Sequence, residues 1–246
     1  MTKLAGKAAL VTGGSRGIGA ATALRLAQDG ADVALTYEHA RDKAEAVADK
    51  IRVLGRKAVV LHADNADPAA LTAVVDRAAA ELGGLDILVN NAGIWHQGEV
   101  GSWSLDEIDK VIAVNVRAVI VASQAAAKHL PEGGRIITTG SCLAERVMDP
   151  GIALYAMSKA ALIGFTKGLA RDLGARGITV NVVHPGSTDT DMNPADGDHA
   201  DDQRARMAIP RYGKAEDIAG LIAYLASEEG RFITGAGIAI DGGVNT

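Results

Sequence analysis

Short runs of apolar, often β-branched residues alternate with longer helical patterns along almost the whole chain. The expected strands are Lys7–Thr12, Asp32–Thr36, Ala58–His62, Leu85–Asn90, Arg135–Thr139, Ile178–Val183 and Gly237–Ile240. Because these runs are apolar on both faces, and because a helical stretch separates each from the next, they predict a mostly parallel sheet with helices on both sides. This alternation limits the fold more than any other feature of the sequence.

The intervening patterns predict helices over Ile18–Asp29, Ala40–Leu54, 68–82, 105–130, Ala153–Leu173 and Ala215–Ala226. Asp67 followed by Pro68 predicts an N-cap with proline in the first helical turn. Ser104 with Glu107 predicts a capping box before the long helix. The polar stretch His184–Tyr212 breaks the alternation, and connections of that length are often functional lids. We therefore expect a single domain over 1–246 with a mobile substrate lid at about 187–212.

Composition excludes several classes of function. The chain has 246 residues and a single cysteine, Cys142, which excludes an internal disulfide and fits a reducing, cytoplasmic compartment. The net charge of -5 comes without a basic block, which argues against a nucleic-acid partner. The most apolar stretch, Val111–Ala127, contains Asn115 and Arg117, so no membrane span is expected. The aspartates of 184–212 lack a ligand spacing, so no metal is expected.

A glycine-rich segment, Gly13-Gly14-Ser15-Arg16-Gly17-Ile18-Gly19, joins the first expected strand to the first helix. Glycines allow the phosphates of a dinucleotide to approach backbone N–H groups at a helix N-terminus. An isolated cluster of this kind could be only a tight turn. The flanking strand and helix favour the phosphate-binding interpretation.

Tyr155 and Lys159 stand four residues apart on one helix face, an arrangement that is usually a solvated surface pair. Ser141, at the carboxyl end of the fifth strand, favours a catalytic interpretation, because ligands bind at that edge of open α/β sheets. We expect Lys159, about 5 Å from the phenol, to lower the pKa of Tyr155 by about two units. Ser141 is expected to donate a hydrogen bond to a substrate carbonyl oxygen.

The G-x-x-x-G-x-G and Y-x-x-x-K spacings resemble the short-chain dehydrogenase/reductase family, and in particular 3-oxoacyl-carrier-protein reductase-like ketoreductases. Asn90-Asn91-Ala92-Gly93 and Asp241-Gly242-Gly243 are also similar to family segments, so the resemblance covers essentially the whole chain. It implies a Rossmann-type doubly wound sheet of seven parallel strands. It also implies reversible reduction of a ketone to a secondary alcohol, and a homotetramer or homodimer that pairs through the helices Val111–Leu130 and Ala153–Leu173.

The same resemblance assigns roles to the four residues of the family's catalytic tetrad. Tyr155 is the acid/base, Lys159 its partner and Ser141 the donor to the substrate oxygen. Asn115 matches the asparagine whose backbone carbonyl holds a water of the proton relay. The spacing from Ser141 to Tyr155 is one residue longer than in many members, which concerns the pocket loop Cys142–Leu154 rather than the catalysis.

The resemblance implies NADP(H) as cofactor, with NAD(H) as the second choice. Tyr37 stands where NAD-dependent members carry a carboxylate, and Arg16 resembles the basic residue that pairs with the 2′-phosphate. Glu38, one residue further on, argues for NAD(H). The residues implied in cofactor binding are Gly13, Ser15, Arg16, Ile18, Gly19, Tyr37, Glu38, Asp64, Asn65, Asn91, Ala92, Gly93, Tyr155, Lys159, Pro185, Gly186, Thr188 and Thr190.

Three residues are expected to line a substrate pocket: Trp95, Leu143 and Met192. Cys142 is expected to pack away from the substrate, and His184 to support the site rather than to touch the nicotinamide. A small-molecule carbonyl compound is the expected partner, and its identity is open.

An alternative function comes from a second resemblance. Arg171-Asp172-Leu173, Asp191 and Asn193–Gly197 are similar to a subgroup that contains a cyclic-di-GMP-binding biofilm-dispersal protein. In that case the same fold is a nucleotide-sensing module. Because a pure binding module needs none of the tetrad, the presence of all four residues favours the enzyme.

Overall fold

The computed structural model describes residues 2–246. Seven strands form one parallel sheet in the order β3-β2-β1-β4-β5-β6-β9, which confirms the doubly wound architecture. The strands are β1 (Ala8–Val11), β2 (Asp32–Tyr37), β3 (Ala58–His62), β4 (Ile87–Asn90), β5 (Arg135–Thr139), β6 (Thr179–Pro185) and β9 (Gly237–Ile240). Their registers are regular, as in the pairing of Leu10 with Ala34 on one side and Leu88 on the other.

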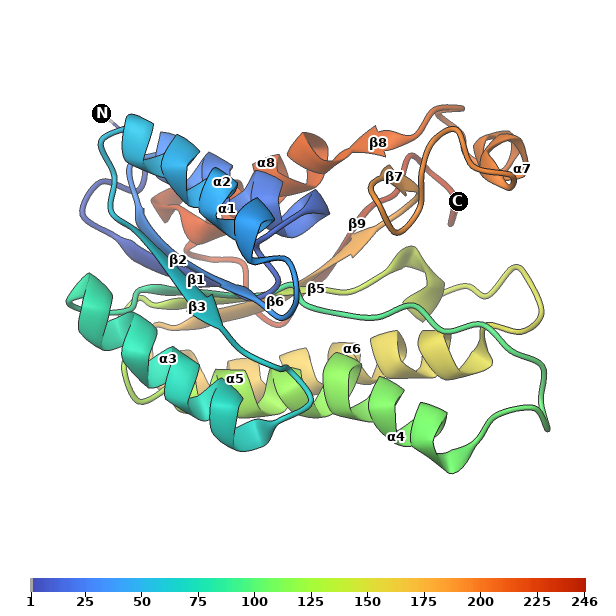
Figure 1. Cartoon of the computed structure of the whole chain (residues 1–246), viewed down its shortest axis with the longest axis horizontal. Helices are drawn as coiled ribbons and strands as arrows, with labels where there is room; N and C mark the ends of the chain where they lie inside the picture. Colours follow the sequence, from blue (N-terminus) through green and yellow to red (C-terminus); the bar gives the residue numbers. More distant parts are fainter. Residues whose placement is uncertain (1) are drawn as a thin grey trace.

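Helices cover both faces of the sheet (Figure 1). On one face lie α1 (Gly17–Gln28), α2 (Arg41–Val53) and α8 (Ala215–Ala226); on the other lie α3 (Pro68–Leu82), α5 (Ala118–Ala126) and α6 (Ala153–Leu173). Each face has its own apolar layer, with Leu26, Ile51 and Ile222 fully buried in the first and Leu71 and Ile136 in the second. The apolar character of the strands on both faces therefore has a direct structural cause.

Within residues 2–246, no helix combines the length and the apolarity that crossing a membrane requires.

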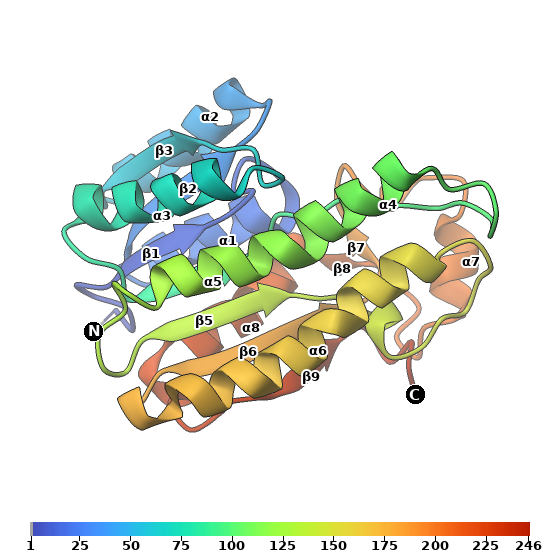
Figure 2. The same ribbon diagram turned by 90° about the horizontal axis from the view of Figure 1, so that it is seen from below.

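The expected long helix to Leu130 is divided. α4 (Leu105–Ile112) begins at the predicted capping box, in which the Ser104 hydroxyl accepts from Glu107 N–H at 3.2 Å. A five-residue π-helical turn, Ala113–Arg117, then connects it to α5, and the two α-helices continue one another in Figure 2. α5 ends at Ala126 rather than Leu130: residues 127–129 form a turn, and Leu130, directly before Pro131, is disfavoured in the helical conformation.

The lid segment (residues 187–212) contains more structure than the sequence indicates. It begins with β7 (Thr188–Asp189), which pairs in parallel with β8 (Gly213–Lys214) just beyond its end, and it contains α7 (Ala200–Ala205). Gln203 of α7 ties the segment together, since its Oε1 accepts from Asn193 Nδ2 at 3.0 Å. A helix of six residues is too short to leave a periodic pattern, so the sequence could not reveal it.

The strand order places the site. It reverses between β1 and β4, and ligands of open α/β sheets bind outside the carboxyl ends of the strands at such a reversal. Because all seven strands are parallel, the residues that follow β1, β4, β5 and β6 meet at this one edge. The motifs found in the sequence therefore converge.

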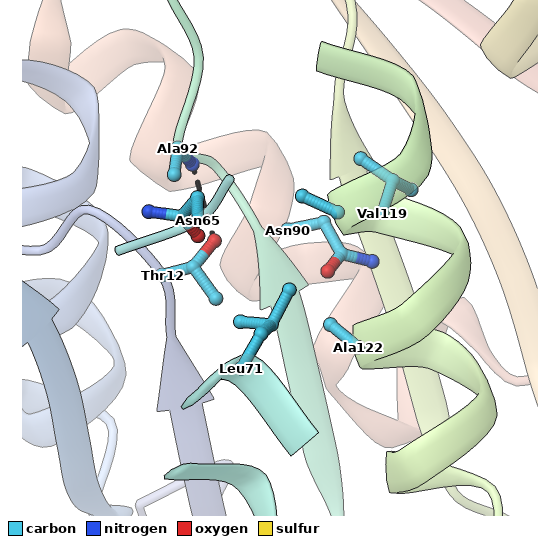
Figure 3. A pocket seen from close by; sticks show the side chains of 8 residues that line it. Thr12, Asn65, Leu71, Asn90, Ala92, Val119 and Ala122 are labelled. Carbon is cyan, nitrogen blue, oxygen red and sulfur yellow. Dashed lines mark hydrogen bonds between the residues drawn. The ribbon is translucent and has the colours of Figure 1, made fainter. Parts of the chain in front are cut away.

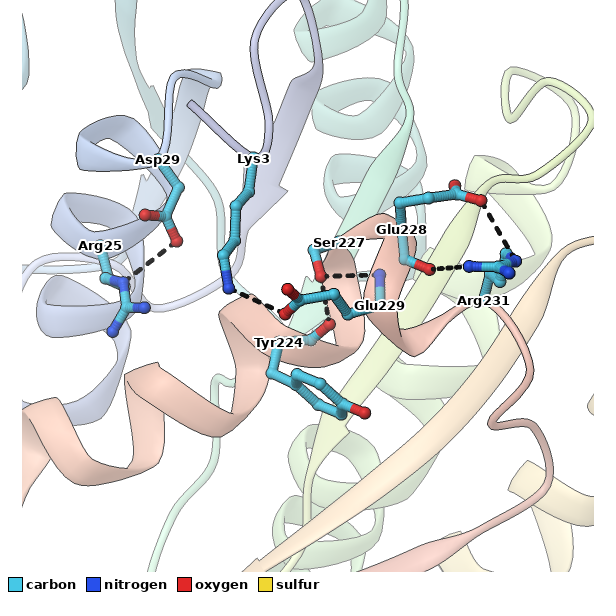
Figure 4. Close-up of polar contacts among 8 residues, drawn as sticks. All are labelled: Lys3, Arg25, Asp29, Tyr224, Ser227, Glu228, Glu229 and Arg231. Carbon is cyan, nitrogen blue, oxygen red and sulfur yellow. Dashed lines mark hydrogen bonds and ion pairs between the residues drawn. The ribbon is translucent and has the colours of Figure 1, made fainter. Parts of the chain in front are cut away.

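The opposite edge of the sheet carries exposed ion pairs (Figure 4). Lys3 contacts Glu229 at 2.8 Å, and Arg231 contacts Glu228 at 3.3 Å. Ser227 ends α8, with its hydroxyl accepting from Glu229 N–H at 3.2 Å. Exposed ion pairs of this kind each contribute little to the free energy of unfolding, so this edge adds only modestly to stability.

The N-cap of α3 provides a test of the fold. The Asp67 carboxylate accepts from Ala69 N–H at 2.8 Å and from Ala70 N–H at 3.1 Å. Asp67→Ala is expected to lower the free energy of unfolding by about 1 kcal/mol, whereas Asp67→Asn keeps a capping oxygen and should cost much less. Urea denaturation measures both. Equal losses in the two variants would mean that charge, and not capping, is what Asp67 contributes.

Candidate active site

The glycine loop packs closely on its surroundings. Gly13 and Gly17 have φ values of 64° and 53°, in the left-handed region that favours glycine. A Cβ on Gly19 would lie 2.2 Å from the Gly13 carbonyl oxygen and 2.4 Å from Asn91 Nδ2, so a side chain there would push α1 away from the loop. The glycines thus let α1 begin directly against the loop, with its first backbone N–H groups at the strand edge, as a phosphate site needs.

Hydrogen bonds hold this loop, which continues β1, to the ends of two neighbouring strands. Gly13 N–H donates to Thr36 Oγ1 at 3.0 Å at the end of β2. The Thr12 hydroxyl accepts from Asn91 N–H at 3.0 Å and from Ala92 N–H at 3.1 Å after β4. Asn91 Nδ2 in turn donates to the Thr12 carbonyl at 3.0 Å. The sequence analysis assigned no role to Thr12 or Thr36, although Thr12 stands directly before the glycine motif.

Figure 3 shows the buried base of this region. Thr12, Asn65 and Asn90 gather there between the ends of β1 and β4 and the helix α5. Asn90 Nδ2 donates to Ser123 Oγ at 3.1 Å, and Asn65 is 8 % exposed. The space among these side chains has no room for a water molecule. They therefore support the cofactor edge and do not form a ligand cavity.

Tyr155, Lys159 and Ser141 are brought together at the carboxyl edge, and all three are buried. The Lys159 ammonium lies 5.8 Å from the centre of the Tyr155 ring and donates to the Thr139 carbonyl at the end of β5, at 3.0 Å. Ser141 follows β5, and its Oγ accepts from Leu143 N–H at 3.2 Å. With its oxygen accepting from Leu143, the Ser141 hydroxyl keeps its proton for the neighbouring Tyr155 oxygen or for a ligand.

The expected effect of Lys159 on the pKa of Tyr155 is wrong for the free chain. Burial raises the pKa of the Tyr155 phenol to about 12, and the hydrogen bond with Ser141 opposes that rise only in part. Burial also lowers the pKa of Lys159 to about 8. The sequence argument used a half-solvated dielectric, but removal of both groups from water outweighs their attraction.

Asn115 lies at the centre of the π-helical turn and is 1 % exposed. Its Oδ1 accepts from Ile94 N–H at 2.9 Å, and its Nδ2 donates to the Ile94 carbonyl at 2.9 Å and to Ser158 Oγ at 3.1 Å. The Asn115 side chain therefore clamps the loop after β4 onto α6. Only its backbone remains for the expected relay.

Gly93 lies where that loop passes closest to the lysine. A Cβ on Gly93 would lie 3.3 Å from both Lys159 Nζ and Asn115 Oδ1. The absence of a side chain here lets the loop and the ammonium share the same narrow space.

His184 lies directly beneath Ser141. It is fully buried, and its Nδ1 is 3.0 Å from the Ser141 carbonyl oxygen. Cβ atoms on Gly140 and Gly237 would lie 2.6 Å and 2.9 Å from the imidazole nitrogens. Because it is enclosed between these two glycines, His184 supports the strand ends and does not reach the surface where a nicotinamide would lie.

Of the three residues expected to line a substrate pocket, Trp95 packs on the Tyr155 ring. The Trp95 ring lies 4.6 Å from the Tyr155 ring and is tilted by 52°. Trp95 and Met192 are 43 % and 55 % exposed, whereas Leu143 is half-buried. Cys142 packs inward with Met207 and Val244.

The residues expected around the adenosine lie at the end of β2 and beside it. Tyr37 is half-buried and meets the His62 ring edge-on at 5.4 Å. Glu38 turns to His39, with Oε1 and Nε2 3.0 Å apart. The Asp64 carboxylate accepts from Ala66 N–H at 2.7 Å, which shapes the turn after β3.

The segment after β6 closes the other side of the edge. A Cβ on Gly186 would lie 2.6 Å from Asp241 Cα, so the chain after Pro185 passes close to the C-terminal strand. Thr188 Oγ1 donates to the Gly186 carbonyl at 3.0 Å. Thr190 Cγ2 lies 3.3 Å from the position of a Cβ on Gly17, which brings this segment against the glycine loop.

The burial of Lys159 predicts a pH dependence of stability. Its pKa is about 8 in the folded chain and near 10.5 when unfolded, so between these values the unfolded chain binds more protons and stability rises with pH. The slope should reach at most about 1.4 kcal/mol per pH unit, and Lys159→Met should remove it. Urea denaturation without cofactor between pH 7.5 and 9.5 measures this; parallel curves for the two proteins would contradict it.

The chain was compared with known families and structures. A family model described as "Enoyl-(Acyl carrier protein) reductase" matches residues 13–245. The cyclic-di-GMP-binding biofilm dispersal mediator protein of Escherichia coli is 46 % identical, covering 98 % of each chain. A 3-oxoacyl-[acyl-carrier-protein] reductase of Staphylococcus aureus is 39 % identical, covering 97 % of this chain and 98 % of its own.

Solved structures agree. A short-chain dehydrogenase from Burkholderia cenocepacia, crystallised in complex with NADP, is 66 % identical, with a TM-score of 0.98 over 99 % of this chain and 100 % of its own. The glycine loop, the converging strand ends and these matches lead to one conclusion: the chain belongs to the short-chain dehydrogenase/reductase family of oxidoreductases.

Proposed function

We propose that this protein is an NADP(H)-dependent ketoreductase, which reversibly reduces a ketone to a secondary alcohol. The observation that carries the proposal is the convergence of Ser141, Tyr155 and Lys159 at the sheet edge beside the glycine loop that begins α1. The relative from Burkholderia cenocepacia, crystallised with NADP, supports the choice of cofactor.

The residues present fit a dinucleotide. Gly17 and Gly19 carry no side chain at the start of α1, and Gly19 packs directly on Gly13, so the backbone N–H groups of this first turn suit a pyrophosphate. Tyr37 at the end of β2 brings no charge against a 2′-phosphate, and Glu38 is engaged by His39. Arg16, 61 % exposed at its side chain, is the cation that would pair with that phosphate. When bound, the reduced nicotinamide supplies the hydride.

The chain's own residues supply the proton. As the substrate carbonyl carbon gains a hydride, negative charge develops on its oxygen, and the Ser141 hydroxyl donates a hydrogen bond to it. Tyr155 transfers its phenolic proton to that oxygen, which yields the alcohol. Since burial raises the pKa of Tyr155 to about 12, the phenol of the free chain holds its proton at neutral pH, and its donation requires stabilisation of the phenolate that remains.

Lys159 stabilises the phenolate that this transfer leaves. Its ammonium, 5.8 Å from the ring centre, is held by the Thr139 carbonyl, and the loop at Gly93 excludes water from one side. In a site with little water, this charge acts on the phenolate more strongly than it does at a surface. Asn115 holds the loop and α6 in register, and we assign the proton relay to its backbone carbonyl.

The substrate site follows from the side chains around the phenol. Trp95 offers an aromatic surface on the Tyr155 ring, and we place the apolar side chains of Leu143 and Met192 around the same pocket. We therefore propose a small carbonyl compound with an apolar or aromatic body. The half-exposed Met192 belongs to the lid segment, which would cover the substrate.

We also propose a homotetramer or homodimer in the cytoplasm. Helices α4 to α6 expose apolar side chains, with Ile112 38 %, Ile120 40 % and Met157 45 % exposed. These lie on the helices whose sequence resembles the pairing faces of the family. Association would remove this apolar surface from water.

A second function is supported by one observation, the 46 % identity to a relative named as a cyclic-di-GMP-binding protein. The fold and the cofactor edge could serve a nucleotide sensor as well. Calorimetry with cyclic di-GMP, with and without saturating NADPH, combined with a ketone-dependent NADPH oxidation assay, separates the two. Binding without ketone turnover would favour the sensor.

The first test concerns the acid. Tyr155→Phe keeps the ring that packs on Trp95 but has no proton to give, so kcat with small ketones should fall by about 10²- to 10⁴-fold. The half-exposed Tyr224 of α8 provides the matched control, and Tyr224→Phe should keep its rate. A Tyr155→Phe enzyme with near wild-type kcat would show that another group donates the proton.

The second test concerns the cofactor. kcat/KM is expected to favour NADPH over NADH, and Arg16→Ala should shrink that preference markedly because it removes the cation for the 2′-phosphate. Arg77→Ala, on α3 with a similarly exposed side chain, controls for the change in net charge. A wild type that prefers NADH, or a preference that Arg16→Ala leaves intact, would assign the choice to Glu38 or another group.

A further inference from the structure

Asp191 joins three separate parts of the cofactor edge through one oxygen atom. Its Oδ2 lies 3.0 Å from Lys43 Nζ on α2 and 3.6 Å from Arg16 Nη1 at the start of α1. Asp191 itself follows β7 in the lid segment. Two cations from different helices therefore reach the same point in space, and a carboxylate oxygen occupies that point.

Asp191 Oδ2 lies where a phosphate of the cofactor is expected. Arg16 is the residue directly before α1, and Thr190, the neighbour of Asp191, touches the space beside Gly17 at the first position of that helix. Lys43 belongs to the first turn of α2, which follows the end of β2 where the adenosine ribose is placed. The same turn also carries Arg41 and Asp42, and Glu38 at the end of β2 is paired with His39.

The contacts are close but replaceable. The side chains of Arg16, Lys43 and Asp191 are 61 %, 59 % and 51 % exposed, so water competes for each of them. Ion pairs at such exposure are worth little, and a doubly charged phosphate would displace a single carboxylate. The hydrogen bond and charge of Lys43 lower the pKa of Asp191, so its carboxylate is ionised at neutral pH.

We propose that Asp191 is an internal competitor for the cofactor's phosphate groups. In the free chain its carboxylate holds Arg16 and Lys43; in the complex these two cations form a phosphate subsite, and Asp191 is released. Asp191 thus sets the affinity for cofactor, and Lys43 is a second determinant beside Arg16. This inference rests on the proposed function, because it requires a dinucleotide at this edge.

The release of Asp191 also connects the cofactor to the lid segment. The far part of the segment has other anchors, such as Ile209 N–H to the Gly242 carbonyl at 2.9 Å and the ion pair of Arg206 with Asp149. Asp191 links the segment to both α1 and α2. Binding of a phosphate would therefore free the start of the lid segment at the moment when the substrate site has to be covered.

The test is cofactor affinity at low ionic strength, measured by NADPH fluorescence titration. Asp191→Asn keeps the shape and removes the competing charge, so its Kd for NADPH should fall about two- to fivefold. Lys43→Met should raise the Kd. In a protein that already carries Lys43→Met, Asp191→Asn should lower the Kd for NADPH by a smaller factor than it does in the wild type. One of the two cations that the Asp191 carboxylate occupies is then absent.

Asp198→Asn is the matched control, since Asp198 is an exposed carboxylate of the same lid segment. It changes the net charge equally and should leave the Kd within error of wild type. Titration with NADH identifies the phosphate: a gain for NADPH alone assigns the 2′-phosphate, and an equal gain for both cofactors assigns the pyrophosphate.

An Asp191→Asn protein that binds NADPH no more tightly than wild type overturns the inference and leaves the proposed function intact. A gain of the same size in Asp198→Asn also overturns it, because general charge would then explain the effect. A wild type that binds neither NADPH nor NADH overturns both the inference and the proposed function.

Discussion

The burial of one ammonium group is the constraint on which the rest of the site depends. Lys159 is 5 % exposed and has the Thr139 carbonyl as its hydrogen-bond partner. Because a charge removed from water needs a fixed partner, this contact sets the position of α6 against the end of β5. Tyr155 follows from it, one turn earlier on the same helix. Gly93 is required because a side chain there would crowd the ammonium.

The parallel order of the strands positions the other residues of the site, as the contact of Lys159 with Thr139 positions α6. Thr12 follows β1, Asn91 follows β4 and Ser141 follows β5, and parallel strands bring all three to one edge. This is why the sequence could predict the fold and the grouping of the site residues. The strand runs are apolar on both faces, the caps at Asp67 and Ser104 are local, and position at a strand end follows from order along the chain.

What the sequence could not predict depends on burial and on contacts between distant segments. Burial raises the pKa of Tyr155 instead of lowering it. The sequence shows the spacing between Tyr155 and Lys159 but not how deeply the two side chains are buried. The π-helical turn at Asn115 follows from the clamp on Ile94 and Ser158, two segments far from it along the chain. The enclosure of His184 between Gly140 and Gly237 likewise involves three strand ends, and no short motif records it.

The structure therefore fixes the geometry of the proton-transfer groups more firmly than that of the groups proposed to select the cofactor. The proton-transfer groups are buried, and a change at Lys159 or Ser141 disturbs packing and desolvated charge together, so their geometry leaves little freedom. The groups proposed to select the cofactor, Arg16 and Glu38 among them, are exposed, and each contributes an energy small enough for a neighbour to offset. A fold built in this way can keep one chemistry at its core while single substitutions at its rim change which cofactor it takes.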